Sequence, residues 1–197
     1  MDKYPNWFET TAKPNFSDYL LPYAGKAGLN FLQVGAYTGD ASKWLLDNVL
    51  THESSTLTDV DTWNGSDEAA HKEFDWNDVE ATYDAKVKEY GSRVNKIKSD
   101  SLTYLRTLPF FTFDFIYIDG DHTALGVFSD AVGAWPLLKP YGVMAFDDYT
   151  WTSGQSPEHE PKKGIDTFLK VAEGSYNLIT KNSQLWVRST LELPPQE

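Results

Sequence analysis

The chain has 197 residues, of which 41% are hydrophobic and 15% aromatic, and its formal net charge at pH 7 is −12. This composition suits one globular domain with a sizeable core, and the absence of cysteine excludes a disulfide framework, a thiolate metal site and a cysteine nucleophile. No run of lysine and arginine forms a basic stripe, which weighs against a nucleic-acid partner.

The N-terminal segment, residues 1–28, carries irregularly spaced aromatic residues interrupted by Pro5, Pro14 and Pro22. We expect short helical turns there that cover the sheet or its ligand-binding edge. The segment lacks the apolar region of a secretory signal. Elsewhere no apolar run approaches the roughly 20 residues that a membrane-spanning helix needs. We therefore expect a cytoplasmic protein that does not bind membranes.

A first strand is predicted over Asn30–Val34, followed by the turn Gly35–Gly39 and a helix that places Trp44, Leu45, Leu46 and Val49 on one face. Glycine at both ends of the turn allows the backbone to approach a ligand closely. The G-x-x-x-G spacing matches neither the G-x-G-x-x-G of dinucleotide folds nor a phosphate-binding loop. It therefore disfavours recognition of a pyrophosphate.

A second predicted strand begins near Ser55 and ends at Asp61, where Rossmann-like folds hold ribose hydroxyls with a carboxylate. We expect Asp59 to point to the other side of this strand from Asp61 and to be a solvated charge. A helix is predicted over Val79–Tyr90, and a third strand over Lys96–Lys98. Asp100 comes next, either as a helix cap or as a ligand contact.

The central unit of the sequence is a predicted strand–helix–strand motif. Its strands are Phe113–Ile118 and Val143–Phe146, and each ends in acidic residues: Asp119, Asp121, Asp147 and Asp148. Because neighbouring parallel strands end at the same edge of a sheet, we expect these four carboxylates to lie together. They repel one another unless one is protonated or a cation lies among them.

After the central unit we expect a mobile polar flap over Trp151–Pro161, a helix over Gly164–Ala172 and an edge hairpin formed by Tyr176–Thr180 and Gln184–Arg188. The predicted organisation is a covering segment at 1–28, one domain at 29–190 and a frayed tail at 191–197.

The motifs VGAYTG, DVDTW, SDS, YIDGDH and DDY, in this order, resemble those of class I S-adenosylmethionine-dependent methyltransferases. Within that class, IDGDH followed by LLKPYGVMAFDDY resembles the small-molecule O-methyltransferases that include the macrolide- and aminocoumarin-sugar enzymes. The resemblance implies an α/β, Rossmann-like, doubly wound sheet of seven strands. Its implied order is 3-2-1-4-5-7-6, with strand 7 antiparallel.

The resemblance also assigns site residues. The implied cofactor-binding residues are Gln33, Gly35, Ala36, Tyr37, Gly39, Asp61, Thr62, Trp63, Asp100, Ser101 and Asp119. The implied Mg²⁺ ligands are Asp119, Asp147 and Asp148. Asp121 matches the proposed general base, and His122 beside it is a second candidate for that role. The chain departs from the family at Gln33, where an acidic residue is usual, and at His122, where sugar methyltransferases often carry an apolar residue.

These observations lead us to expect methyl transfer from S-adenosylmethionine to an oxygen of a small hydroxylated acceptor, assisted by a divalent metal. The alternatives are a metal-independent methyltransferase and a non-catalytic module that binds S-adenosylmethionine. An iron-dependent hydroxylase is disfavoured because its site needs a second histidine at a strand end. The expected partner is a small molecule, and the sequence leaves a homo-oligomer open.

Overall fold

A computed structural model describes residues 3–66 and 70–192 of the chain. The chain divides into two compact units, Met1–Ser101 and Leu102–Glu197. The predicted domain at 29–190 includes parts of both units and stays a prediction. Of the predicted tail, residues 193–197 lie outside the described part of the chain. Within the described ranges, no helix has the length and apolar character needed to cross a membrane.

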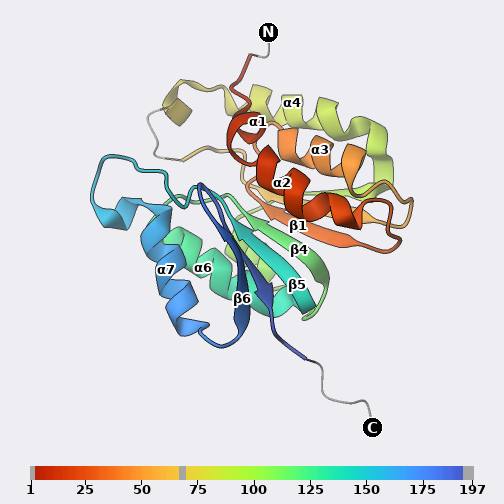
Figure 1. Cartoon of the computed structure of the whole chain (residues 1–197). Helices are drawn as coiled ribbons and strands as arrows, with labels where there is room; N and C mark the ends of the chain where they lie inside the picture. The colour runs from red at the N-terminus through yellow and green to blue at the C-terminus, as the bar shows by residue number, and fades with distance from the viewer. Residues whose placement is uncertain (1–2, 67–69, 193–197) are drawn as a thin grey trace. The chain divides into compact units, whose positions relative to one another are not determined.

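Helices and strands alternate through most of the chain (Figure 1). The α-helices are α1 (Trp7–Thr11), α2 (Lys13–Leu20), α3 (Asp40–Asn48), α4 (Trp76–Val87), α5 (Ser101–Leu105), α6 (Ala124–Ala134) and α7 (Pro161–Val171). The 3₁₀ helices are η1 (Leu21–Tyr23), η2 (Ala70–Glu73), η3 (Lys88–Arg93), η4 (Trp135–Leu137) and η5 (Pro157–His159). The strands are β1 (Asn30–Val34), β2 (Thr56–Asp61), β3 (Val94–Lys98), β4 (Phe113–Ile118), β5 (Leu138–Phe146), β6 (Tyr176–Lys181) and β7 (Leu185–Ser189).

The seven strands follow the order β3-β2-β1-β4-β5-β7-β6, as predicted. In the first unit β1 pairs with β2 and β2 with β3, both in parallel. In the second unit β4 and β5 are parallel, whereas β7 runs antiparallel to both β5 and β6. The α/β class, the order and the antiparallel seventh strand are therefore confirmed.

The start of α3 in the first unit depends on Gly39. This residue precedes the helix with φ +81°, and a Cβ atom on it would lie 2.9 Å from the ring of Tyr83 in α4. A side chain at this position would therefore be strained and would also displace Tyr83, so only glycine allows α3 and α4 to pack this closely.

Helices α6 and α7 pack side by side in the second unit (Figure 1). The contact is close because α7 carries Gly164, where a Cβ atom would lie 2.2 Å from the backbone oxygen of Ala124.

In the neighbouring strands β4 and β5, Ile118 pairs with Phe146. Asp119 and Asp147 follow these two paired residues directly, so the predicted adjacency of the two acidic strand ends is confirmed.

Two helices begin earlier than the sequence pattern predicted. Helix α4 begins at Trp76 rather than Val79, because the Asp75 side chain accepts hydrogen bonds from the first free N–H groups of the helix. Helix α7 begins at Pro161 rather than Gly164. Proline suits the first turn of a helix, where its missing N–H group would have no partner in any case.

Candidate functional site

In the first unit, the backbone turn after β1 is fixed by the Asp61 carboxylate at the end of β2. Asp61 Oδ2 accepts hydrogen bonds from the N–H groups of Ala36 (2.8 Å) and Tyr37 (2.9 Å). Asp61 Oδ1 accepts one from the N–H of Trp63 (2.7 Å). Gly35 and Tyr37 both have positive φ, at +86° and +47°. The carboxylate therefore stabilises a turn conformation that Tyr37 would otherwise rarely adopt.

Two buried side chains support the same turn. Gln33 Nε2 donates to the backbone oxygen of Gly35 (2.8 Å), and Trp63 Nε1 donates to the backbone oxygen of Tyr37 (2.9 Å). Gln33 is 2% exposed, and its Oε1 has no hydrogen-bond partner among the described residues. A buried acceptor without a partner is costly, so this oxygen is a place where a ligand donor would be stabilised.

The ends of β2 and β3 are joined by a hydrogen bond from the N–H of Ser99 to the backbone oxygen of Asp61 (3.0 Å). Asp100 follows as an exposed residue, and Ser101 is the first residue of α5. Thr62 is half-buried, and its hydroxyl accepts from the N–H of Asn64 (3.2 Å).

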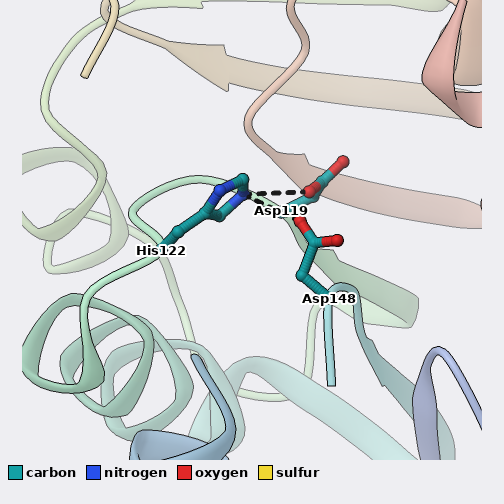
Figure 2. A group of neighbouring side chains, drawn as sticks. All are labelled: Asp119, His122 and Asp148. Carbon is teal, nitrogen blue, oxygen red and sulfur yellow. Dashed lines mark ion pairs between the residues drawn. The ribbon is translucent and has the colours of Figure 1, made fainter. Parts of the chain in front are cut away.

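In the second unit, three side chains converge at the ends of β4 and β5 (Figure 2). His122 Nε2 lies 3.2 Å from Asp148 Oδ2 and 3.5 Å from Asp119 Oδ1. One potential ligand atom from each residue lies within 4.8 Å of the other two, which is close enough for all three to hold one metal ion. Burial and the neighbouring charges of Asp147 and Asp148 hold the pKa of Asp119 well above its usual range.

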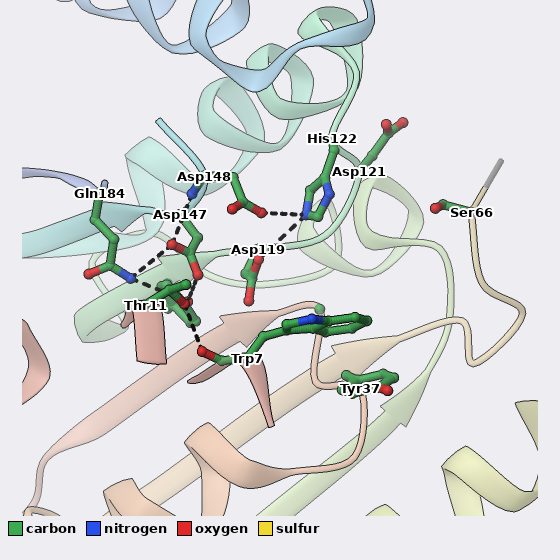
Figure 3. Close-up of polar contacts among 12 residues, drawn as sticks. Trp7, Thr11, Tyr37, Ser66, Asp119, Asp121, His122, Asp147, Asp148 and Gln184 are labelled. Carbon is green, nitrogen blue, oxygen red and sulfur yellow. Dashed lines mark hydrogen bonds and ion pairs between the residues drawn. The ribbon is translucent and has the colours of Figure 1, made fainter. Parts of the chain in front are cut away.

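Asp147 has a different environment from Asp148, although the two are adjacent in sequence. Its carboxylate is buried and accepts hydrogen bonds from the Tyr117 hydroxyl, Gln184 Nε2 (3.1 Å) and the N–H of Asp148 (2.9 Å) (Figure 3). The group that the structure brings together is thus Asp119, His122 and Asp148, where the resemblance implied Asp119, Asp147 and Asp148.

A sequence model of the family described as "Methyltransferase domain" matches residues 32–149, more than half of the chain. The chain belongs to this methyltransferase family. Its match begins in β1 and ends at Tyr149, so it includes the turn held by Asp61 as well as the group formed by Asp119, His122 and Asp148.

Solved structures of methyltransferases share the fold. NovP, an O-methyltransferase, matches 90% of this chain with 79% of its own, at 15% identity and a TM-score of 0.66. TomG from Streptomyces achromogenes, an O-methyltransferase in complex with SAM, matches 82% of this chain with 73% of its own, at 16% identity and a TM-score of 0.61. The SAH-bound methyltransferase PaMTH1 from Podospora anserina matches 81% of this chain with 71% of its own, at 16% identity and a TM-score of 0.58. No curated protein sequence matches significantly.

In this methyltransferase, Asp121 lies outside the group formed by Asp119, His122 and Asp148. Its Oδ1 accepts a hydrogen bond from the N–H of Thr123 (2.8 Å) at the start of α6, and its carboxylate lies over Gly126. Figure 3 shows the side chain pointing away from Asp119 and Asp148. Of the two candidate bases, the structure therefore places His122 beside the other strand-end residues and leaves Asp121 exposed.

The prediction that Asp59 is a solvated strand-end charge is wrong. The side chain is fully buried, and Asp59 Oδ2 accepts a hydrogen bond from the Tyr83 hydroxyl (2.7 Å). Burial raises the pKa of Asp59 to about 7, even though the Tyr83 hydrogen bond favours the ionised form. The expected opposite direction of Asp59 and Asp61 is also wrong, because residues two apart in a strand point to the same face, and α4 covers that face at Asp59.

The N-terminal segment covers the turn after β1 with aromatic rings, which the sequence only suggested. The Trp7 indole of α1 stacks on Tyr37, with ring centroids 5.0 Å apart and an interplanar angle of 28° (Figure 3). Three more rings pack around Tyr37, with centroids at most 6.3 Å from its own: those of Tyr4, Phe74 and Trp76. Tyr37 thus belongs to an aromatic wall at the turn, and burial raises the pKa of its hydroxyl.

Proposed function

We propose that this protein transfers a methyl group from S-adenosylmethionine to an oxygen of a small hydroxylated molecule, assisted by a divalent cation. The observation that carries the proposal is the turn after β1, held by Asp61 within the matched methyltransferase region. Structural relatives with the same fold contain SAM or SAH. The proposed location is the cytoplasm, without a nucleic-acid or membrane partner.

The residues of the first unit fit the chemical groups of S-adenosylmethionine, which carries an ammonium group, a ribose diol and an adenine ring. When bound, it supplies an electrophilic methyl group on its sulfonium sulfur. Gln33 Oε1, buried without a partner among the described residues, suits the ammonium. Asp61 Oδ1 accepts one hydrogen bond, from Trp63, and retains a position for a ribose hydroxyl, since a carboxylate oxygen accepts about two. Asp100 and Ser101, at the end of β3, are proposed to contact the adenine.

The residues of the second unit fit a divalent cation. Asp119 and Asp148 supply the oxygen ligands that Mg²⁺ prefers, and the His122 nitrogen extends the range to Mn²⁺. When bound, such a cation lowers the pKa of a hydroxyl group that contacts it. Asp119 and Asp148 would hold the cation, whose charge would offset both the burial of Asp119 and the repulsion from its neighbours, the two causes that raise the pKa of Asp119.

A metal-independent methyltransferase is the second candidate, and the position of His122 favours it. Two carboxylates lie within 3.5 Å of His122 Nε2. They would stabilise the imidazolium that forms when His122 accepts a proton from an acceptor hydroxyl. The two candidates differ in whether activity survives removal of divalent cations.

The proposed function predicts that the full chain binds S-adenosylmethionine and S-adenosylhomocysteine in preference to NAD or ATP. Asp61→Ala should weaken this binding about 10- to 100-fold, or ~1.5–3 kcal/mol, because the N–H groups of the turn lose their acceptor and the ribose loses a charged acceptor. Calorimetry measures the ligand preference of the wild type and the affinity of the variant, with Asp84→Ala, an exposed acid of α4, as the matched control. Absence of S-adenosylmethionine binding by the wild-type protein would contradict the proposed function.

The segment between Asp148 and α7 should behave as a flap over the acceptor. Trp151 begins it, with its N–H donating to the backbone oxygen of Asp148 (3.0 Å) and its ring 5.4 Å from that of His122. Further along, residues 154–159 are exposed, and the N–H groups of Gly154 and Gln155 donate only to local hydroxyl groups, two residues back, instead of to a paired strand. Amide exchange at 152–160 should therefore be much faster than in β5, and should slow when cofactor and acceptor are added. Exchange as slow as in β5 without ligands would rule out a flap.

A further inference from the structure

A chain of buried hydrogen bonds leads from the C-terminal hairpin to Asp147, and Figure 3 shows its last step, from Gln184 to Asp147. Trp186 Nε1 of β7 donates to Gln184 Oε1 (2.9 Å), and Gln184 Nε2 donates to Asp147 Oδ1 (3.1 Å). The Tyr117 hydroxyl of β4 donates to Asp147 Oδ2. All four side chains are at most 7% exposed.

The orientation of the Gln184 amide follows from this chain. An indole nitrogen can only donate, so Trp186 must face the amide oxygen of Gln184. The amide NH₂ group then points at Asp147, where it provides a donor to a buried carboxylate. Reversing the amide would place two acceptors together and two donors together, so Trp186 sets the direction in which Gln184 acts.

Asp148 has a left-handed backbone conformation, with φ +54°, which is uncommon for a residue other than glycine and is kept here by its surroundings. On its N-terminal side, Asp148 donates its N–H to Asp147 Oδ1 (2.9 Å). On its C-terminal side, Tyr149 donates its N–H to the backbone oxygen of Ser183 (2.8 Å), and its hydroxyl to Asp166 (2.8 Å). Asp148 is therefore held between two anchored neighbours, with its carboxylate directed at His122.

We propose that Gln184 is a positioning residue for the candidate metal site, and that Asp147 is the anchor through which it acts rather than a metal ligand. Asp147 accepts hydrogen bonds at both carboxylate oxygens, and these bonds fix the strained turn that presents Asp148 to Asp119 and His122. This inference rests on the proposed function, because Gln184 and Asp147 are inferred to orient a ligand of the cation site that the proposed function assumes.

The experiment compares Mn²⁺ affinity, measured by calorimetry on the full chain, in wild type, Gln184→Leu, Tyr117→Phe, Asp147→Asn and Asp148→Asn. Gln184→Leu should lose about 10- to 100-fold in affinity, the usual effect of removing a group that orients a ligand. Tyr117→Phe keeps the ring and should lose less. Asp147→Asn keeps an acceptor oxygen for the Asp148 N–H, and it should lose clearly less than Asp148→Asn. S-adenosylmethionine affinity should stay unchanged in Gln184→Leu and Tyr117→Phe.

The matched control is Tyr141→Phe, which removes a hydroxyl of β5 that donates to exposed Glu192 and lies outside this chain of hydrogen bonds. Equal losses in Asp147→Asn and Asp148→Asn, or wild-type affinity in Gln184→Leu, would overturn the inference. If the wild type binds no Mn²⁺, the metal part of the proposed function fails. A crystal structure of Gln184→Leu then decides the inference. It should show Asp148 moved away from His122, and an unchanged separation of 3.2 Å would refute the positioning role.

Discussion

Replacing Asp148 with asparagine should abolish most of the stabilisation by Mg²⁺ and most of the methyl-transfer activity. Wild-type protein at a Mg²⁺ concentration 100 times the dissociation constant should gain about 2.7 kcal/mol, or roughly 5–10 °C in melting temperature for a chain of this length. Asparagine keeps the shape and one oxygen but removes the charge that attracts the cation. We therefore expect the gain in stability to vanish and the activity to fall by a factor of about 100 or more. Replacing even a residue that only orients a metal ligand reduces metal affinity or activity 10- to 100-fold.

Thermal scans with and without Mg²⁺ measure the first effect, and a methyl-transfer assay with small hydroxylated acceptors measures the second. Asp84→Asn removes one exposed carboxylate of α4 and should respond to Mg²⁺ like the wild type. Activity that persists in excess EDTA, together with a melting temperature insensitive to Mg²⁺, would contradict the metal assignment. The reading with His122 as a metal-independent base would then account for the group formed by Asp119, His122 and Asp148.

The sequence predicted the strand order and the meeting of two acidic strand ends because both depend on regular backbone geometry. Short apolar runs separated by a helix specify neighbouring parallel strands. The register that pairs Ile118 with Phe146 then brings Asp119 and Asp147 to one edge without any long-range information about side chains. The same argument placed Asp61 at the end of β2.

The directions of individual acidic side chains could not be predicted in the same way. Whether Asp147 or Asp148 faces His122 depends on the positive φ of Asp148 and on Gln184, which lies 37 residues beyond Asp147. The only sequence signal was the pair Gln184 and Trp186 at the start of the last strand, an amide and an indole two residues apart and therefore on one face. Asp121 likewise follows a strand end, but the start of α6 takes its carboxylate.

The cover of the first unit was only partly predictable. The prolines and aromatic residues of the N-terminal segment indicated short helices over a ligand edge, and α1 and α2 are short. The stacking of Trp7 on Tyr37 needs the left-handed conformation of Tyr37. That conformation in turn needs the hydrogen bond from the Tyr37 N–H to Asp61, so one strand-end carboxylate decides both features.

The buried carboxyl of Asp59 should make the protein less stable as the pH rises towards 7. Its pKa is about 7 in the folded protein against 3.8 as the ordinary value, so the folded state holds a proton that the unfolded state releases between these two pH values. The free energy of unfolding should thus decrease with rising pH, by at most about 1.4 kcal/mol per pH unit, and level off above pH 7. Burial is the main cause, because the charged form must be desolvated.

Asp59→Asn removes this pH dependence, since asparagine stays neutral. Its amide oxygen can accept from the Tyr83 hydroxyl, and its NH₂ group can donate to the buried Ser42 hydroxyl beside it. Between pH 5 and pH 8 the wild type should lose roughly 2–3 kcal/mol of stability that the variant keeps, so the stability difference between them should change by that amount. Urea unfolding at both pH values measures the difference, and Asp84→Asn, an exposed acid, should show none. Parallel stability curves for wild type and Asp59→Asn would mean that Asp59 keeps its charge inside the fold.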